Sequence, residues 1–248
     1  MTEKLRIAAL SGWHVHAVDY AKVINSQPNA QVVAVWDDLL ERGQKWAKEL
    51  NAEFVGDYRK ILSRPDIDGV VVNSATNMHK EIIIEAARAG KHVFTEKVLA
   101  TTLSDARDIA KEVRKSKIYF TISFPFRTRP PVLLAKKIIT SGELGAVSLL
   151  RIRLAHNGSL DNWLPQHFYN LKECGGGAMI DLGAHGMYLS HWLLGKPNRI
   201  TSIFNKLSGR EVEDNAISVM EFENSAIAIN ETSFVSWGGS FSIEIDGT

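Results

Sequence analysis

The sequence predicts an α/β fold: a Rossmann-type, doubly wound parallel sheet, followed by an α+β domain with a mainly antiparallel open sheet. In the first half, short apolar strands alternate with amphipathic helices, and such alternation requires parallel strands joined by crossovers. After Pro125 this alternation ends. The last part carries four strand-like runs joined by short polar turns, with no helix between them, which is typical of an antiparallel sheet.

The first half is expected to form one domain, residues 1–123. Its strands are short apolar runs, expected at residues 5–10, 31–36, 69–73, 92–95 and 118–122. Its helices show apolar residues at helical spacing, at residues 17–24, 39–50, 80–89 and 103–116.

The second half, residues 124–248, is expected to form the α+β domain. Its helices are expected at residues 130–141, which start with two prolines, and 178–194. Its strands are expected at residues 147–154, 200–207, 216–222, 226–235 and 241–245.

Composition and charge exclude several classes of protein. The chain has 248 residues, and its 29 Lys and Arg against 28 Asp and Glu give a formal net charge of +1. A general nucleic-acid binder or membrane-surface protein needs a basic excess, so we expect neither partner. The single cysteine, Cys174, excludes an intramolecular disulfide. We expect no signal sequence or membrane span, and therefore a cytoplasmic protein.

The loop Ser11–His14 follows the first strand, where a dinucleotide-binding fold carries G-x-G-x-x-G. The three glycine slots hold Leu10, Gly12 and Val15, or Ser11, Trp13 and His16 if shifted by one. At most one of them is glycine, so this fingerprint is poor. Asp37 ends the second strand, close to the roughly 20-residue offset at which an acidic residue meets the ribose hydroxyls. A carboxylate there repels a 2′-phosphate and favours NAD over NADP, but Asp37 also suits the polar start of the next helix.

Polar segments follow two later strands of the first half. Asn73–His79 follows one, and Glu96-Lys97 follows the other. Ligands bind at the carboxyl ends of parallel strands, where Lys97 would meet a substrate hydroxyl; the alternative is an ordinary solvated lysine. In the second half, Asp181 and His185 are four residues apart on one helix face. A histidine beside a carboxylate suits proton transfer from an alcohol. The alternative interpretation is a helix-start aspartate beside an ordinary, partly buried histidine.

Together these segments resemble the Gfo/Idh/MocA family of nicotinamide-dependent oxidoreductases, over residues 5–247. The resemblance is carried by four motifs, which are Asn77-x-His79, the run Ala89-Gly90-Lys91-His92-Val93-x-x-Glu96-Lys97, Ser141-Gly142-Glu143-Leu144-Gly145, and Gly175-Gly176-Gly177 through Asp181 to His185. The chain departs from the family in its depleted glycine fingerprint, in Val98 where proline is usual, and in Tyr188 where aspartate is frequent. Members of the family are longer, so we expect the chain to be truncated after Thr248.

The resemblance implies an NAD(P)-binding domain at residues 1–123 and a substrate and oligomerisation domain at 124–248. It implies that Lys97 holds the substrate hydroxyl, that His185 accepts its proton with help from Asp181, and that hydride passes to the nicotinamide. The implied cofactor contacts are Ser11, Gly12, Trp13, His14, Asp37, Ser74, Thr76, Asn77, His79, Glu96 and Lys97. Arg127 and Trp163 are the expected substrate-side residues, and no metal site is expected.

We therefore expect an NAD-preferring dehydrogenase of a sugar, inositol or related polyol, which forms a homodimer or homotetramer through the C-terminal sheet. One alternative is a non-catalytic nucleotide sensor on the same fold, suggested by the missing glycines. A minor alternative is a metal-dependent hydrolase, because His14-Val15-His16 could supply two ligands, with Lys97, His156, His185 and Asp214 as further candidates. That class needs a barrel of eight βα units, which the consecutive strands near the C-terminus contradict.

Overall fold

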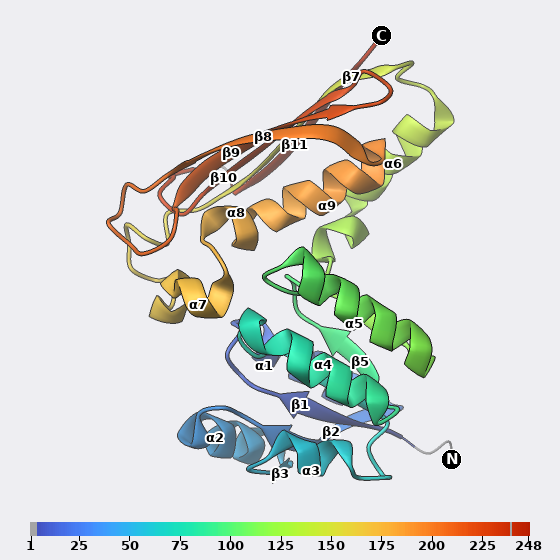
Figure 1. Ribbon diagram of the computed structural model, residues 1–248, viewed down its shortest axis with the longest axis vertical. Helices are drawn as coiled ribbons and strands as arrows, with labels where there is room; N and C mark the ends of the chain where they lie inside the picture. The colour runs from blue at the N-terminus through green and yellow to red at the C-terminus, as the bar shows by residue number, and fades with distance from the viewer. Residues whose placement is uncertain (1–3, 239) are drawn as a thin grey trace. The chain divides into compact units, whose positions relative to one another are not determined.

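The computed structural model describes residues 4–238 and 240–248. The chain divides into two compact units, Met1–Ser123 and Phe124–Thr248, which Figure 1 traces from blue to red. Within the described residues, no helix combines the length and apolarity that a membrane crossing requires.

The first unit contains a six-stranded parallel sheet with the strand order β3-β2-β1-β4-β5-β6. This confirms the predicted Rossmann-type sheet. The strands are β1 (Leu5–Leu10), β2 (Ala30–Trp36), β3 (Glu53–Phe54), β4 (Gly69–Val72), β5 (His92–Thr95) and β6 (Phe120–Ile122). The sequence analysis missed β3, because a two-residue strand is too short to show a periodicity.

Helices cover this sheet in two separate cores. They are α1 (Ala17–Ser26), α2 (Leu40–Leu50), α3 (Tyr58–Leu62), α4 (His79–Arg88) and α5 (Leu103–Ser116), with the 3₁₀ turn η1 (Thr76–Met78) before α4. Residues of α1 and α2 pack with Ala9 of β1. Residues of α3, α4 and α5 pack with Ala8 and Leu10 of the same strand. Because alternate strand residues face opposite sides, the two helix groups cover opposite faces.

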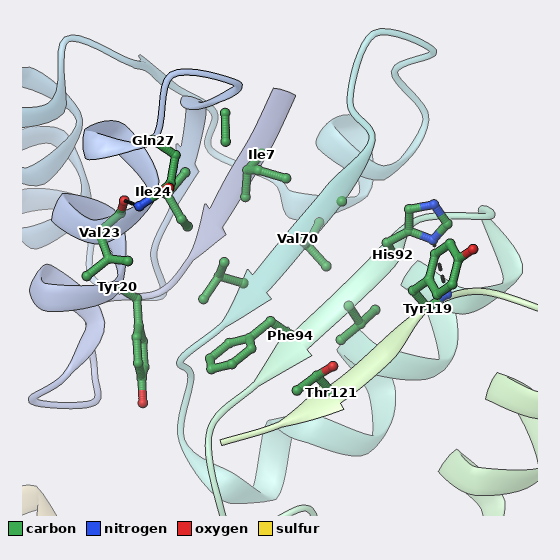
Figure 2. A pocket seen from close by; sticks show the side chains of 14 residues that line it. Ile7, Tyr20, Val23, Ile24, Gln27, Val70, His92, Phe94, Tyr119 and Thr121 are labelled. Carbon is green, nitrogen blue, oxygen red and sulfur yellow. Dashed lines mark hydrogen bonds between the residues drawn. The ribbon is translucent and has the colours of Figure 1, made fainter. Parts of the chain in front are cut away.

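One part of the sheet carries a hollow instead of a helix. It has a volume of about 430 Å³ and lies beside α1, over β4, β5 and β6. Figure 2 shows Tyr20 at its rim and Phe94 and Thr121 on its floor. The helices that follow β4 and β5 pack in the other core, and the chain leaves the unit after β6. The described part of the first unit therefore places no helix over this hollow.

The second unit contains a five-stranded sheet with the order β11-β7-β10-β9-β8. The strands are β7 (Val147–Ala155), β8 (Pro197–Asn205), β9 (Asn215–Phe222), β10 (Ile227–Ser233) and β11 (Phe241–Gly247). Three of its pairs are antiparallel, and β10 pairs with β7 in parallel. The prediction of a mainly antiparallel sheet is confirmed, and the parallel pair makes it mixed.

Helices pack against one face of this sheet. The helical segments are η2 (Pro125–Thr128), α6 (Pro130–Ser141), η3 (Gln166–Tyr169), α7 (Leu171–Cys174), α8 (Ala178–Asp181) and α9 (Gly183–Leu194). Leu189 and Leu193 of α9 join Leu150 and Met220 of the sheet in one core. The single helix expected at residues 178–194 is divided at Leu182, where the His185 N–H donates to the Leu182 carbonyl in a tighter i to i−3 bond.

Candidate active site

The carboxyl ends of four neighbouring strands meet at one edge of the first sheet. Leu10 is paired with Trp36 on one side and with Val72 on the other, and Val72 is paired with Thr95. The segments that follow these strands therefore lie together, which places the predicted cofactor residues of the first unit at a single edge. They are Ser11, Gly12, Trp13, His14, Asp37, Ser74, Thr76, Asn77, His79, Glu96 and Lys97.

The loop after β1 is built with side-chain hydrogen bonds in place of the missing glycines. Ser11 adopts a left-handed backbone with φ of 70°, which costs a non-glycine residue about 1 kcal/mol. Its hydroxyl accepts from the Trp13 N–H at 3.1 Å and donates to Asp38 at 2.7 Å. The His14 N–H donates to the Asn73 carbonyl at 3.0 Å. The loop is thereby tied to both neighbouring strands.

Asp37 is buried at the end of β2 and accepts from four protein donors. The Gly12 N–H bonds its Oδ2 at 2.7 Å, and the Leu39 N–H bonds its Oδ1 at 2.8 Å. Arg42 adds two donors, Nε, which bonds Oδ2 at 2.8 Å and Oδ1 at 3.0 Å, and Nη2, which bonds Oδ1 at 2.7 Å. Sequence reasoning missed Arg42, whose position in the first turns of α2 was the available signal. A guanidinium at this strand end is also the group that suits a 2′-phosphate.

Unpartnered polar atoms lie at the end of β4. The side-chain amide of Asn73 and the hydroxyl of Ser74 are buried, and neither has a hydrogen-bond partner among the residues that the structure describes. Buried polar groups are normally satisfied, so a bound polar ligand at this edge would complete them. The residues present therefore fit a dinucleotide, and Thr76 and Asn77 follow directly in η1.

His79 connects two loops of this edge. Its Nδ1 lies 2.9 Å from the Val98 carbonyl, and its Nε2 lies 3.0 Å from the Ser74 carbonyl. Burial lowers the pKa of His79, while these carbonyls act in the opposite direction. Both ring nitrogens thus face backbone carbonyls, and a neutral ring, which carries one N–H, donates to one of them. These contacts give the His79 side chain a positioning role at the site.

Glu96 anchors the end of β5. Its carboxylate accepts from the Tyr20 hydroxyl through Oε1 and from the Lys97 N–H through Oε2 at 2.8 Å. The Tyr20 hydroxyl also lies 2.8 Å from the Ser123 hydroxyl. Burial, followed by the negative charge of Glu96, raises the pKa of Tyr20. Sequence reasoning missed Tyr20, and its position on α1, four residues after His16 of the preceding loop, was the available local signal.

Lys97 follows Glu96 at the same sheet edge, and the peptide bond from Lys97 to Val98 is cis. The Lys97 N–H bond to Glu96 and the His79 bond to Val98 hold the backbone on both sides of it. The structure thus positions the backbone of Lys97 rigidly. Its predicted contact with a substrate hydroxyl stays a prediction.

In the second unit, Asp181 ends α8 and His185 lies in the first turn of α9. His185 Nδ1 is 2.9 Å from the Tyr188 hydroxyl, and its ring centroid lies 4.6 Å from that of Phe126. Tyr188, a departure from the family pattern, is therefore a hydrogen-bond partner of the expected proton acceptor. Burial lowers the pKa of His156, and the charge of Asp181 opposes that shift.

Gly177, the last of the three glycines before α8, packs too closely against Glu213 to carry a side chain. A Cβ on Gly177 would lie 1.9 Å from the Glu213 carbonyl oxygen. The Glu213 carboxylate accepts from the Gly177 N–H at 2.9 Å and from the Met179 N–H at 3.0 Å. This side chain binds the free N–H groups at the start of α8, as a capping residue does. Sequence reasoning missed Glu213, which is distant along the chain.

The two expected substrate-side residues lie on separate segments of the second unit. The Arg127 guanidinium in η2 sits 4.7 Å above the centroid of the Trp192 ring. Trp163 is 53% exposed, and its Nε1 donates to Asn157 at 3.3 Å. Their role toward a substrate stays a prediction.

Known proteins resemble the chain along its whole length. It is 28% identical over 258 residues to scyllo-inositol 2-dehydrogenase (NAD(+)) of Bacillus subtilis, covering 100% of this chain and 73% of that protein. It is 28% identical over 249 residues to D-glucoside 3-dehydrogenase of Escherichia coli, covering 93% and 70%. The crystal structure of GenD2 from gentamicin A biosynthesis in complex with NAD superposes with a TM-score of 0.91 and 27% identity, covering 100% and 71%.

The chain spans between 47% and 73% of the length of its curated relatives. Two family models account for nearly all of it. Residues 132–248 match the GFO/IDH/MocA C-terminal domain, and residues 11–124 match an oxidoreductase family with an NAD-binding Rossmann fold. The chain therefore belongs to the Gfo/Idh/MocA family of oxidoreductases, and its first unit is that family's NAD-binding Rossmann fold.

Proposed function

We propose that this chain catalyses NAD-dependent oxidation of a secondary alcohol in a sugar, inositol or related polyol, or the reverse reduction of the ketone. Family membership and the names of two relatives, an inositol and a glucoside dehydrogenase, support this class of substrate. NAD, when bound, supplies the hydride acceptor.

The protein's part in this reaction is to bind the alcohol and remove its proton. Lys97 holds the substrate hydroxyl, since an ammonium donates hydrogen bonds to oxygen. His185 accepts the hydroxyl proton, a role in which enzymes commonly use an imidazole. Tyr188, 2.9 Å from His185 Nδ1, fixes the ring, and Asp181 stabilises the positive charge that the ring gains.

The observation that carries the proposal is the position of Lys97. It directly follows Glu96, whose carboxylate is anchored by Tyr20 and by the Lys97 N–H. It lies at the sheet edge that also carries the unpartnered side chains of Asn73 and Ser74. A lysine whose backbone is held, beside polar side chains that no described residue satisfies, suits a substrate and dinucleotide site.

The test begins with calorimetric titration of the purified chain with NADH and, in parallel, NADPH. Hydride transfer is then followed by NADH absorbance on a panel of inositols, sugars and polyols. Lys97→Ala should lower turnover on the substrate found by about 10²–10⁴-fold and leave the free energy of unfolding nearly unchanged. Lys111→Ala, an exposed lysine on α5, is the matched control.

Retention of full turnover by Lys97→Ala would remove Lys97 from the reaction. Binding of NADH by the unaltered chain without turnover on any substrate of the panel would favour the nucleotide-sensor alternative. Binding of neither dinucleotide would refute the proposal itself.

A further inference from the structure

Three side chains of metal-binding type gather at the edge of the first sheet. His14 and His16 belong to the loop before α1, and Glu96 ends β5. One potential ligand atom from each residue lies within 4.8 Å of the other two. Because β4 lies between β1 and β5 in the sheet, the loop after β1 has to cross the end of β4 to bring its histidines near Glu96. The hydrogen bond from the His14 N–H to the Asn73 carbonyl holds the loop in that position.

The imidazole of His14 lies beside the Glu96 carboxylate. Its Nδ1 accepts the His16 N–H at 3.3 Å and lies 3.8 Å from Glu96 Oε1. A ring nitrogen that accepts a hydrogen bond carries no proton, and an unprotonated imidazole nitrogen is the form that binds a metal. The His16 ring centroid is 5.0 Å from that of His14.

Glu96 supplies a carboxylate that is almost removed from water. Its side chain is 2% exposed and accepts from Tyr20 and from the Lys97 N–H. Burial of a charged carboxylate is unfavourable unless an opposite charge compensates it. A divalent cation beside Oε1 would provide that charge. The N-terminus of α1 weakly disfavours a cation, but a full carboxylate charge at ligand distance outweighs this partial charge.

We propose that His14, His16 and Glu96 form a binding site for a divalent transition metal of the zinc class. Two imidazoles and one carboxylate, with a fourth position open, are a ligand set that Zn²⁺ takes in proteins. The nitrogen ligands select against Mg²⁺ and Ca²⁺, which prefer oxygen. Tetrahedral bonds of about 2.1 Å need ligand atoms roughly 3.4 Å apart. His14 Nδ1 and Glu96 Oε1, 3.8 Å apart, therefore have to approach by about 0.4 Å, and the exposed His16 side chain has to turn toward them to supply the third ligand.

This site goes beyond the proposed dehydrogenase and does not depend on it. It shares the Ser11–His14 loop with the predicted cofactor contacts. NADH binding is therefore measured separately, on metal-free protein in EDTA, so that failure of one proposal is distinguishable from failure of the other.

The experiment titrates the metal-free chain with Co²⁺, followed by its visible absorption, and with Zn²⁺ by calorimetry. We expect one metal per chain and the intense absorption of four-coordinate Co²⁺. His16→Ala and Glu96→Gln should each weaken Zn²⁺ binding by at least about tenfold, with folding checked by circular dichroism. Because His16 is exposed, the His16→Ala chain tests the site even where Glu96→Gln fails to fold.

The matched control is His92→Ala, an exposed histidine at the start of β5, at the opposite edge of the sheet. It should bind Zn²⁺ as the unaltered chain does. Equal losses in His92→Ala and His16→Ala would show unspecific binding to surface histidines and overturn the site. Unchanged Zn²⁺ affinity in His16→Ala would overturn it as well.

Discussion

Asp37 and Arg42 set the charge at the end of β2, where the Rossmann fold recognises the adenosine ribose. The Asp37 side chain is fully buried, and its two oxygens accept from Arg42 and from backbone N–H groups. The carboxylate disfavours a 2′-phosphate, while the guanidinium attracts one. The choice between NAD and NADP therefore depends on both residues.

Asp37→Ala should shift the preference from NADH toward NADPH by about tenfold or more, because a charge-assisted hydrogen bond contributes roughly 1.5–3 kcal/mol. It also frees the Arg42 guanidinium for the 2′-phosphate. The measurement is calorimetric affinity for both dinucleotides. The double variant Asp37→Ala/Arg42→Ala should lose the gain in NADPH affinity; an unchanged affinity ratio in Asp37→Ala contradicts the role of Asp37.

His79 makes the stability of the first unit depend on pH. Burial lowers its folded-state pKa below the ordinary 6.5, so the unfolded chain takes up a proton more readily than the folded one. The contribution of neutral His79 is therefore complete above pH 6.5 and is lost as the pH falls below it. The loss amounts to at most about 1.4 kcal/mol per pH unit.

Urea unfolding at pH 7.5 and pH 5.5 measures this effect. The unaltered chain should lose more free energy of unfolding between the two values than His79→Gln does. His92→Gln, at an exposed histidine of the same unit, should behave like the unaltered chain. An equal pH dependence in all three proteins would show that His79 does not contribute.

At the scale of elements, the start of α8 depends on a contact between Gly177 and Glu213. The Glu213 backbone occupies the space that a Cβ of residue 177 would take, and its carboxylate binds the N–H groups of Gly177 and Met179. This contact sets the position at which α8 begins. Asp181 is the last residue of α8, so its position depends on the same contact.

Gly177→Ala should lower the free energy of unfolding by about 1–3 kcal/mol, because the added methyl group forces the Glu213 backbone away. Gly56→Ala is the control, since no atom lies within 4 Å of a Cβ built there, and it should change stability by less than about 0.5 kcal/mol. Denaturant unfolding at neutral pH measures both. Equal effects of the two substitutions would contradict the packing explanation.

At the scale of the molecule, the described helices of the second unit pack on one face of its sheet and leave the other face without a helix. An outer apolar strip there contains Ile203 of β8, Ile217 and Val219 of β9, and Ile229 of β10, which are neighbours by register. Ile203 is 69% exposed. Exposed apolar area on a sheet face marks an association surface, and this strip supports the proposed homodimer or homotetramer.

Ile203→Glu should convert the oligomer to monomers, because it places a charge in the middle of that strip. Size-exclusion chromatography with light scattering measures the mass. Leu103→Glu, an equally exposed leucine on α5, should leave the mass unchanged. A monomeric unaltered chain would contradict the association surface.

Most strands and helices were predictable because their signals are local. The apolar runs of β1, β2, β4 and β5, and the glycine that ends α4, are readable within about ten residues. The family motifs that indicate Lys97, Asp181 and His185 are local in the same sense, and the roles of these three residues stay predictions. The placement of ligand-binding residues at strand ends follows from the parallel sheet alone.

Other features came only from the folded chain, since they depend on contacts between distant residues. No periodicity shows that Tyr20 binds Glu96 or that Glu213 binds the start of α8. The parallel pairing of β10 with β7 and the gathering of His14, His16 and Glu96 are of the same kind. Local patterns record which face of an element is buried, whereas the partner on that face is selected by packing of the whole unit.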